Sequence, residues 1–359
     1  MKFLFDLTTD EQKKWFFTTA QSENYRFRQF RKWLFQPGVT SFESMSNLPR
    51  SLRKMLAETF TLRTMQVLAK SGEETESAEK FLLQLADGNR IETVLLHNDS
   101  GEHSVCVSTQ VGCAMRCAFC ASGMDGMLRN LTAGEILEQF LLVADYLKER
   151  EKKTHREERL SHAVIMGMGE PTANANALLQ ALEQVSSADG MGMSARKMTI
   201  STVGIPGGIA KIANCDKPYH LAVSLHAPND ALRSQIIPAN RHFGIRQILH
   251  DADDYFEKTG RRVTYEYILL AGINDQSQHA SELAQLLRNR NAMVNLIPCN
   301  PVPGKPFHPP SEKQIQRFVQ ILQNHGINVV LRHRKGDKIQ AACGQLRAAH
   351  RSTKTFPTS

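Results

Sequence analysis

Residues 105–120 read VCVSTQVGCAMRCAFC, a short apolar run followed at once by three closely spaced cysteines. The run VCVST has the length and the β-branched content of a strand. Cys113, Cys117 and Cys120 form a C-x3-C-x2-C array after it. If the strand belongs to a parallel barrel, the array lies at the carboxyl end of that barrel, where such folds place their active sites.

Downstream of this stretch, short apolar runs alternate with polar or amphipathic segments. The further runs with strand character are HAVIMGM, KMTISTV, HLAVSLH, VTYEYILL and MVNLIPC, with INVVLRH after them. About six βα units are therefore visible, fewer than the eight of a TIM barrel. We expect an α/β fold, a partial (βα)6 barrel with functional residues at the carboxyl ends of its strands.

Helix signals support this alternation. Thr132 and Glu135 fit a capping box ahead of ILEQFLLVADYL, and Ser311 and Gln314 fit a second one ahead of IQRFVQILQNHG. Gly326 follows the second segment, where a glycine commonly ends a helix. Both segments are predicted to be amphipathic helices.

Two further parts precede the barrel. Residues 1–72 are predicted to form a small helical accessory domain, because segments such as SENYRFRQFRKWLFQ carry apolar residues at helical spacing. Residues 73–103 are predicted to be a β-hairpin linker around Asp87-Gly88, a dipeptide favoured where a tight turn needs positive φ angles. The barrel is then expected over residues 104–333, with a polar, basic loop and tail over residues 334–359.

Composition limits the class of protein. The chain has 359 residues, 41% of them hydrophobic and 22% charged, which is ordinary for a globular protein. No apolar run approaches the roughly 20 residues that span a bilayer, and the first residues have no signal-peptide pattern. We expect a cytoplasmic protein that does not enter a membrane. A net charge of +8 favours a nucleic-acid partner, although a merely basic protein fits the charge equally well.

The cysteine count favours metal or redox chemistry. Seven cysteines are an odd number in a chain without a secretory signal, so a disulfide framework is not expected. Cys215 and Cys299 are predicted to be passive. Three clustered thiols suit a [4Fe-4S] cluster that keeps one iron free of protein ligands. The alternatives are a Cys3His zinc site using His103 and a group of unligated core cysteines.

Several motifs resemble one known family. In order along the chain they are QVGCAMRCAFC, RNLTAGEI, MGMGEP, STVGI, SLHAPND, NLIPCNPVPG and AACGQL. The first is similar to the signature of the radical S-adenosylmethionine (SAM) superfamily. From about Phe27 to Leu346 the set resembles the bacterial dual-specificity RNA methyltransferases, which form 2-methyladenine in 23S ribosomal RNA and certain tRNAs. The resemblance implies one [4Fe-4S] cluster on Cys113, Cys117 and Cys120, with SAM chelated at the unique iron.

The resemblance also implies a mechanism with two further cysteines. Adenine C2 has neither a nucleophilic lone pair nor an acidic proton, so the methyl group is carried first on Cys343. A 5′-deoxyadenosyl radical from a second SAM removes hydrogen from that methyl group, and the resulting carbon radical adds to C2. Glu92 takes the C2 proton. Cys106 then attacks Cys343 to form a transient disulfide and release the RNA, and reductant restores both thiols.

Residues that match SAM-contacting positions of the family follow other predicted strands. Glu170 is expected to accept a hydrogen bond from the SAM amine, and Gly169 to allow close backbone approach. The remaining expected SAM contacts are Ser201, Ser224, Leu225, His226 and Asn300.

RNA contacts are expected from the N-terminal helices. Arg26, Arg28, Arg31 and Lys32 alternate there with Tyr25, Phe27, Phe30 and Trp33, although most of these aromatic residues suit a core better. The mixed-charge run KEREKKTHREERL, residues 148–160, is predicted to be solvated. The partners expected from the family are 23S rRNA, tRNA or both, and a flavodoxin or ferredoxin system. The protein is expected to be a monomer.

Three alternative functions remain open from sequence. The nearest is the related adenine-C8 rRNA methyltransferase that confers antibiotic resistance, although SLHAPND and NLIPCNPVPG favour the C2 enzymes. The second is a noncatalytic iron-sulfur or zinc RNA-binding protein, in which Cys343 has no role. The third is a radical SAM enzyme acting on a small metabolite, against which the basic charge and AACGQL argue.

Overall fold

The computed structural model describes residues 1–73, 76–98, 100–332 and 339–347. Its centre is one ten-stranded sheet with the order β14-β13-β12-β11-β10-β9-β6-β5-β4-β3. Seven of these strands, from β6 to β14 in the sheet order, pair with one another in parallel. They are β6 (Glu102–Cys106), β9 (Arg159–Ile165), β10 (Met198–Thr202), β11 (His220–Ser224), β12 (Val263–Leu269), β13 (Ala292–Pro298) and β14 (Asn328–Leu331). The partial barrel predicted from the sequence is confirmed.

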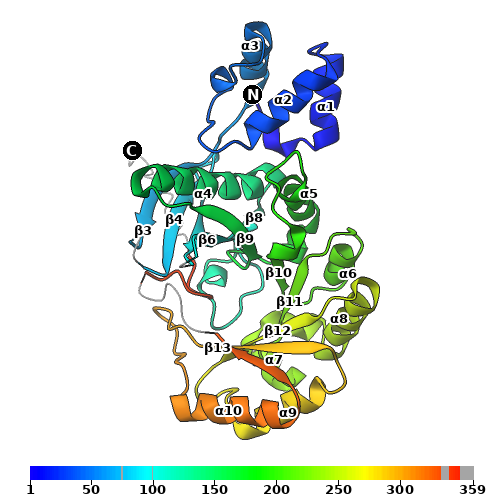
Figure 1. Ribbon diagram of the computed structural model, residues 1–359. Coiled ribbons are helices and arrows are strands. Elements are labelled where there is room, and N and C mark those ends of the chain that lie inside the picture. Colours follow the sequence, from blue (N-terminus) through cyan, green and yellow to red (C-terminus); the bar gives the residue numbers. More distant parts are fainter. Residues whose placement is uncertain (74–75, 99, 333–338, 348–359) are drawn as a thin grey trace, which may run out of the picture.

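Helices cover the outer face of the parallel strands (Figure 1). They are α4 (Ala133–Thr154), α5 (Ala175–Ser186), α6 (Gly208–Ala213), α7 (Asp230–Ile236), α8 (Ile245–Thr259), α9 (Ser277–Leu286) and α10 (Glu312–Asn324). The predicted capping box at Thr132 and Glu135 opens α4. Ser311 accepts a hydrogen bond from the N–H of Gln314 at the start of α10, and Gly326 follows that helix with a φ of 75°. In the described part of the chain, none of the helices combines the length and apolarity that crossing a bilayer requires.

The hairpin ahead of the barrel is larger than predicted. β4 (Ala78–Gln84) and β5 (Arg90–Leu96) pair antiparallel across Gly88, whose φ is 82°, as the Asp-Gly dipeptide indicates. β5 also pairs with β6, so the hairpin extends the main sheet. β3 (Gln66–Ser71) adds an outer antiparallel strand. The prediction that this segment is helical is wrong, because every residue of β3 is exposed and an edge strand shows no apolar alternation.

A small helical unit lies at one end of the molecule (Figure 1). It contains α1 (Thr9–Thr18), α2 (Asn24–Leu34) and α3 (Arg50–Thr59), and β1 (Lys2–Phe3) pairs with β2 (Phe60–Thr61). Phe27 and Phe30 are buried against Phe16, so these two rings belong to the core rather than to an RNA surface.

Polar contacts fix the helical unit on the barrel. Asp6 Oδ1 accepts a hydrogen bond from the N–H of Gly134 at the start of α4. The guanidinium of Arg31 is 1% exposed, donates to Gln184 of α5 and pairs with Asp189 at 3.3 Å. The prediction that Arg31 faces RNA is therefore wrong, because its guanidinium is buried and pairs with groups of the protein itself.

The mixed-charge run is also only partly solvated. Arg150 lies on the buried side of α4, where it pairs with Glu79 at 3.2 Å and with Glu158 at 2.7 Å. Glu158 also hydrogen-bonds His103. We call this group the buried charged cluster; its members are Lys70, Glu79, His97, His103, Tyr146, Arg150 and Glu158.

Candidate active site

The three clustered cysteines lie on one loop, residues 113–126, that we call the cysteine loop. A short ribbon of β7 (Gln110–Gly112) and β8 (Met127–Asn130) holds its ends together. Gly112 has a φ of 78°, and a Cβ there would lie 2.0 Å from the carbonyl oxygen of Gly126. The ribbon leaves no space for a side chain at this position, so only glycine allows the two ends of the loop to approach this closely.

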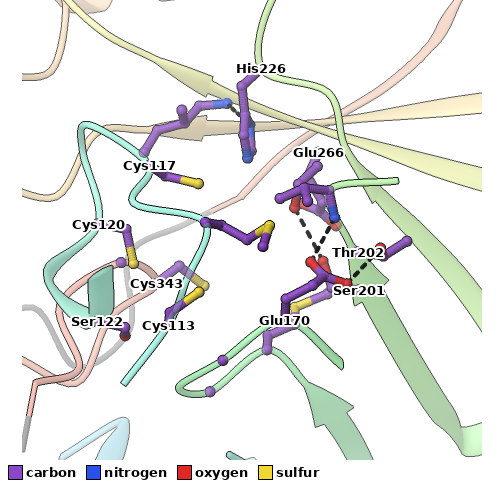
Figure 2. Close-up of a pocket in the computed structure, with 18 of the residues that line it drawn as sticks. Cys113, Cys117, Cys120, Ser122, Glu170, Ser201, Thr202, His226, Glu266 and Cys343 are labelled. Atoms are coloured by element: carbon purple, nitrogen blue, oxygen red, sulfur yellow. Dashed lines mark hydrogen bonds between the residues drawn. The ribbon is translucent and has the colours of Figure 1, made fainter. Parts of the chain in front are cut away.

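The cysteine loop turns its thiols toward one pocket. Cys113, Cys117 and Cys120 all line a pocket of about 860 Å³ that is partly open to solvent. Figure 2 shows these thiols and that of Cys343 turned toward one space. The loop is held by the N–H of Ala118, which donates to Ile236 O at 2.8 Å, and by Lys305 Nζ, which donates to Ala118 O at 2.6 Å.

The three thiols of the cysteine loop fit an iron-sulfur cluster better than they fit the Cys3His zinc site considered above. Burial raises the pKa of the Cys113 thiol to about 12 and raises those of Cys117 and Cys120, so metal binding must release these protons. His103 is not the fourth ligand that the zinc alternative needs, because its ring hydrogen-bonds Glu158 and does not line the pocket. Three thiols of one loop match the ligand set of a cluster with one iron left for another ligand.

The opposite wall is built from strand ends. Ser201 and Ser224 lie on neighbouring strands, and their Oγ atoms are 3.3 Å apart. His226 follows β11, with its Nδ1 accepting from the N–H of Ile268 at 3.1 Å. Burial, with help from Arg233, lowers the pKa of His226 to about 3. A neutral ring whose Nδ1 is an acceptor carries its proton on Nε2, so His226 is a hydrogen-bond donor there.

Gly169 and Glu170 form the turn after β9. Gly169 has a φ of 106°, and a Cβ there would lie 2.7 Å from the side chain of Gln110. The Glu170 carboxylate accepts hydrogen bonds from Thr172 N and Oγ1, Thr202 Oγ1 and Val203 N, at 2.6 to 3.0 Å. Burial raises the pKa of Glu170. Its side chain thus holds together the loops that follow β9 and β10.

Two of the predicted SAM contacts, Leu225 and Asn300, do not line the first pocket. Leu225 is fully buried in the main core and does not line the pocket, although its neighbours Ser224 and His226 do. Asn300 is 5% exposed, and its Nδ2 donates to Cys343 O at 3.2 Å. Asn300 Oδ1 is buried without a partner among the described residues. An orphaned acceptor of this kind fits a polar ligand group.

Cys343 connects the first pocket to a second one. The second pocket has about 630 Å³ of space and contains Cys106, Asn300, Arg332 and Cys343. Cys343 lines both pockets, so its sulfur lies between the cysteine loop and Cys106. Cys106 ends β6, although the predicted strand VCVST continued to Thr109, and residues 107–109 separate it from β7.

The C-terminal segment, residues 339–347, is tied to the barrel mouth. Gln345 Nε2 donates to Pro301 O at 2.9 Å, and its Oε1 accepts from Ala342 N at 3.1 Å. Ser122 Oγ of the cysteine loop donates to Leu346 O at 2.7 Å. These bonds bring Cys343, which is more than 200 residues from Cys120 along the chain, into the same site as the cysteine array.

Glu92 lies close to this arrangement but lines neither pocket. Its carboxylate pairs with Lys80 at 3.0 Å and accepts from the N–H of Arg347 at 2.8 Å. It is 5% exposed, so it is not a solvated hairpin carboxylate. Val94 is opposite Cys106 in the β5–β6 pair, and alternation puts Glu92 on the same face as Val94.

Sequence reasoning missed several residues of the site. Thr202, Glu266 and Arg332 all line the first pocket, and Phe119 packs edge-to-face on His226 with ring centroids 5.0 Å apart. Arg332 lies near the carboxyl end of the predicted strand INVVLRH, so the strand-end rule that selected Ser201 also applied to it. Cys215 and Cys299 line neither pocket.

Family models match two parts of the chain. The model described as the ribosomal RNA large subunit methyltransferase N-terminal domain matches residues 3–62, and the radical SAM superfamily model matches residues 107–284. The first match covers the helical unit. The second begins directly after β6, includes the cysteine loop and ends within α9.

Individual relatives match over nearly the whole chain. A probable dual-specificity RNA methyltransferase RlmN from Rhodopirellula baltica is 51% identical over 96% of this chain and 90% of its own. One from Caldicellulosiruptor saccharolyticus is 43% identical over 96% of both. The crystal structure of a radical SAM methyltransferase from Sphaerobacter thermophilus has a TM-score of 0.90 at 40% identity, covering 97% of this chain and 99% of that one. The chain therefore belongs to the RlmN family of dual-specificity RNA methyltransferases, within the radical SAM superfamily.

Proposed function

We propose that this protein methylates C2 of adenine in RNA, in 23S rRNA, tRNA or both. The observation that carries the proposal is the place of Cys343, which lines the pocket of the cysteine loop and also the pocket of Cys106. A sulfur in this position reaches both the source of a methyl group and a second thiol. A noncatalytic RNA-binding protein has no use for that arrangement.

The first pocket supports the binding of both cofactors. Cys113, Cys117 and Cys120 would hold one [4Fe-4S] cluster. SAM would be held by Gly169, Glu170, Ser201, Ser224 and His226 of this pocket, with Leu225 between the last two, and Asn300 would contact it from the adjoining second pocket. When bound, the pair supplies the one-electron chemistry that activates a carbon with no nucleophilic lone pair.

The Glu170 contacts define its part in this scheme. Because its carboxylate already accepts four hydrogen bonds, Glu170 mainly holds the loop that presents Gly169 to SAM. His226 adds a neutral Nε2–H donor, and Asn300 adds an unpartnered acceptor.

The chain's own residues would carry the methyl group and then release the product. Cys343 carries it as a thioether, through which the methylene carbon becomes bonded to adenine C2. Glu92 takes the C2 proton, and one electron would leave the base for the redox centre that the first pocket would hold, so that the adduct has no unpaired electron. The Cys106 thiolate attacks the sulfur of Cys343, so that an S–S bond forms and the S–C bond breaks. The electron pair of that bond goes to the methylene carbon, which takes up a proton and becomes the methyl group.

The same scheme identifies partners. The disulfide that it leaves requires a reductant, so we place the enzyme in the cytoplasm with a flavodoxin or ferredoxin system as electron donor. The target adenine has to enter a pocket, which favours RNA loops and partly folded RNA over a perfect duplex.

The test is anaerobic reconstitution with iron and sulfide, followed by incubation with SAM, reductant and RNA. Nucleoside mass spectrometry should then detect 2-methyladenosine. Detection of 8-methyladenosine would instead identify the antibiotic-resistance activity, and no methylated adenosine would contradict both. Turnover without RNA would support a small-metabolite substrate.

A further inference from the structure

Arg332 lies where the two pockets meet. It follows β14, and its backbone N–H donates to Leu296 O at 2.9 Å. Its side chain lines the first pocket together with the cysteine loop, and the second together with Cys106 and Cys343. Nη1 is 4.0 Å from the sulfur of Met166, the residue that follows β9. Arg332 and Cys343 therefore both lie at the boundary between the two pockets.

The surroundings of this cation are unusual. Within the described chain, no carboxylate lies within the 4 Å of an ion pair with Arg332, whereas Arg31 and Arg150 each have one. Leaving a charge in a pocket without a counter-ion is costly. The charge of a Cys343 thiolate is the largest cause of the raised pKa of Arg332, and Glu266 and Cys106 add to it. The nearby groups that can become anionic are thus two thiols and one buried carboxyl group.

Cys106 needs such a cation. Burial first, and then Cys343, raise the pKa of Cys106 to about 12, while Arg332 and the N–H of Met166 lower it. A thiol attacks sulfur only as the thiolate. Met166, which follows β9, Arg332, which follows β14, and Cys343 of the C-terminal segment lie around Cys106. β5 pairs directly with β6 and places Val94 opposite Cys106, and the ion pair of Glu92 with Lys80 lies on that same strand face. β13 contributes only the apolar Ile297.

We propose that Arg332 is a positioning residue for release of the product, because its guanidinium stabilises the negative charge on the sulfur of Cys106 as that sulfur attacks Cys343. This inference rests on the proposed function. In the attack, the S–S bond forms while the S–C bond to the methylene carbon breaks, and the electron pair leaves with that carbon. Arg332 is not consumed and transfers no proton, so its contribution is electrostatic.

The experiment compares Arg332→Gln and Arg332→Lys with the wild type and with Arg317→Gln. Arg317 is exposed on α10, away from both pockets, and controls for the loss of one positive charge. The rate of alkylation of Cys106 by iodoacetamide is measured at pH 8 by peptide mass spectrometry, because a thiol with a pKa of about 12 reacts there through its small thiolate fraction. This rate should fall about tenfold or more in Arg332→Gln, which corresponds to a rise of one unit or more in the pKa of Cys106. Arg332→Lys should show a smaller fall, and Arg317→Gln none.

A second readout follows RNA. Arg332→Gln should retain its cluster absorbance and S-methylation of Cys343, but accumulate RNA bonded to Cys343. An unchanged alkylation rate of Cys106 at pH 8 in Arg332→Gln would overturn the inference, whether or not RNA binding weakens. If Arg332→Gln does not fold, the alkylation rate of Arg332→Lys decides. Failure of the wild type to form 2-methyladenosine would contradict the proposed function itself, whereas the alkylation rate tests Arg332 separately.

Discussion

In the proposed scheme the chemistry depends on Cys343, because among the described residues it is the cysteine that lines both pockets. Its backbone carbonyl accepts from Asn300, so its position is fixed by the same loop that borders SAM in our proposal. Cys106 lies in the second pocket only. Removing each thiol in turn should therefore stop the reaction at different points.

The first prediction concerns this pair. Cys343→Ala should abolish methyl transfer to RNA while the cluster absorbance stays unchanged, because residue 343 is not in the cysteine array. Cys106→Ala should still form S-methyl-Cys343 but should trap RNA on the enzyme, visible as a gel shift that survives denaturant. Methyl transfer by Cys343→Ala at the wild-type rate would contradict the proposed function, and free methylated RNA from Cys106→Ala would remove the role of the second thiol.

At the scale of elements, the C-terminal segment has no helix or strand of its own and is held by side-chain hydrogen bonds. Gln345 of the segment is 7% exposed; it makes one such bond to Pro301 O of the barrel and one within the segment, to Ala342 N. Losing a buried pair of hydrogen bonds costs roughly 1–3 kcal/mol. The opening of residues 339–347 should therefore become about tenfold or more frequent when Gln345 is changed.

The second prediction uses Gln345→Ala. Hydrogen exchange should accelerate across the C-terminal segment, and S-methylation of Cys343 should slow, with the cluster content unchanged. Gln320→Ala is the matched control, because Gln320 is an exposed residue of α10 that only bonds Asn324. Equal exchange in both variants would mean that the other contacts of the segment suffice without Gln345.

The buried charged cluster makes a third prediction, about pH. Burial alone raises the pKa of Glu79, but hydrogen bonds from His97, Lys70 and Tyr146 outweigh burial and lower it to about 2. The folded pKa is thus below the unfolded value of 4.5. The stabilisation is complete above pH 4.5 and is lost as the pH falls toward 2. Its size is on the order of 3 kcal/mol.

Urea unfolding at several pH values between 6 and 3 tests this. Glu79→Gln should unfold more easily than the wild type near neutral pH, since Arg150 and Lys70 lose their carboxylate partner. The difference between the two proteins should shrink as the pH falls, and comparing them cancels acid effects on the cysteine loop, which both share. A difference that is constant from pH 6 to pH 3 would contradict the assignment to Glu79.

The elements were largely predictable because their signals are local. Apolar runs of strand length identified the parallel strands, and the Thr132–Glu135 pair marked the start of α4. β3 carried no such signal, since as an exposed edge strand it buries no face. Arg150 was missed for a related reason. A charged residue reads as solvated until the fold brings Glu79 and Glu158 to it.

At the scale of the whole molecule, the site is assembled from residues far apart in the chain. The motifs located the cysteine loop and the strand ends, but spacing alone says nothing about which side chains meet across a barrel. Arg332 and Glu266 come together with Cys343 only when β12, β14 and the C-terminal segment close around one space. Such contacts depend on tertiary structure, so the sequence alone did not reveal them.

The distribution of positive charge also becomes clear only at this scale. On α2, Arg31 is buried, whereas Arg28 and Lys32 are exposed one turn apart. On α10, Lys313 and Arg317 form a second exposed pair with the same spacing. The two pairs lie at opposite ends of the molecule (Figure 1). If the helical unit binds RNA, only the α2 pair should contribute to the salt dependence of binding.

The fourth prediction follows from this comparison. Each phosphate contact adds about 0.7 to 0.9 to the slope of log Kd against log salt. Arg28→Ala with Lys32→Ala should therefore lower that slope by about 1.5, and should weaken binding to RNAs of different sequence to a similar extent, because phosphate contacts carry no base information. Lys313→Ala with Arg317→Ala removes the same charge and should leave the slope unchanged. Equal losses in the two double variants would mean that net charge, rather than the helical unit, attracts RNA.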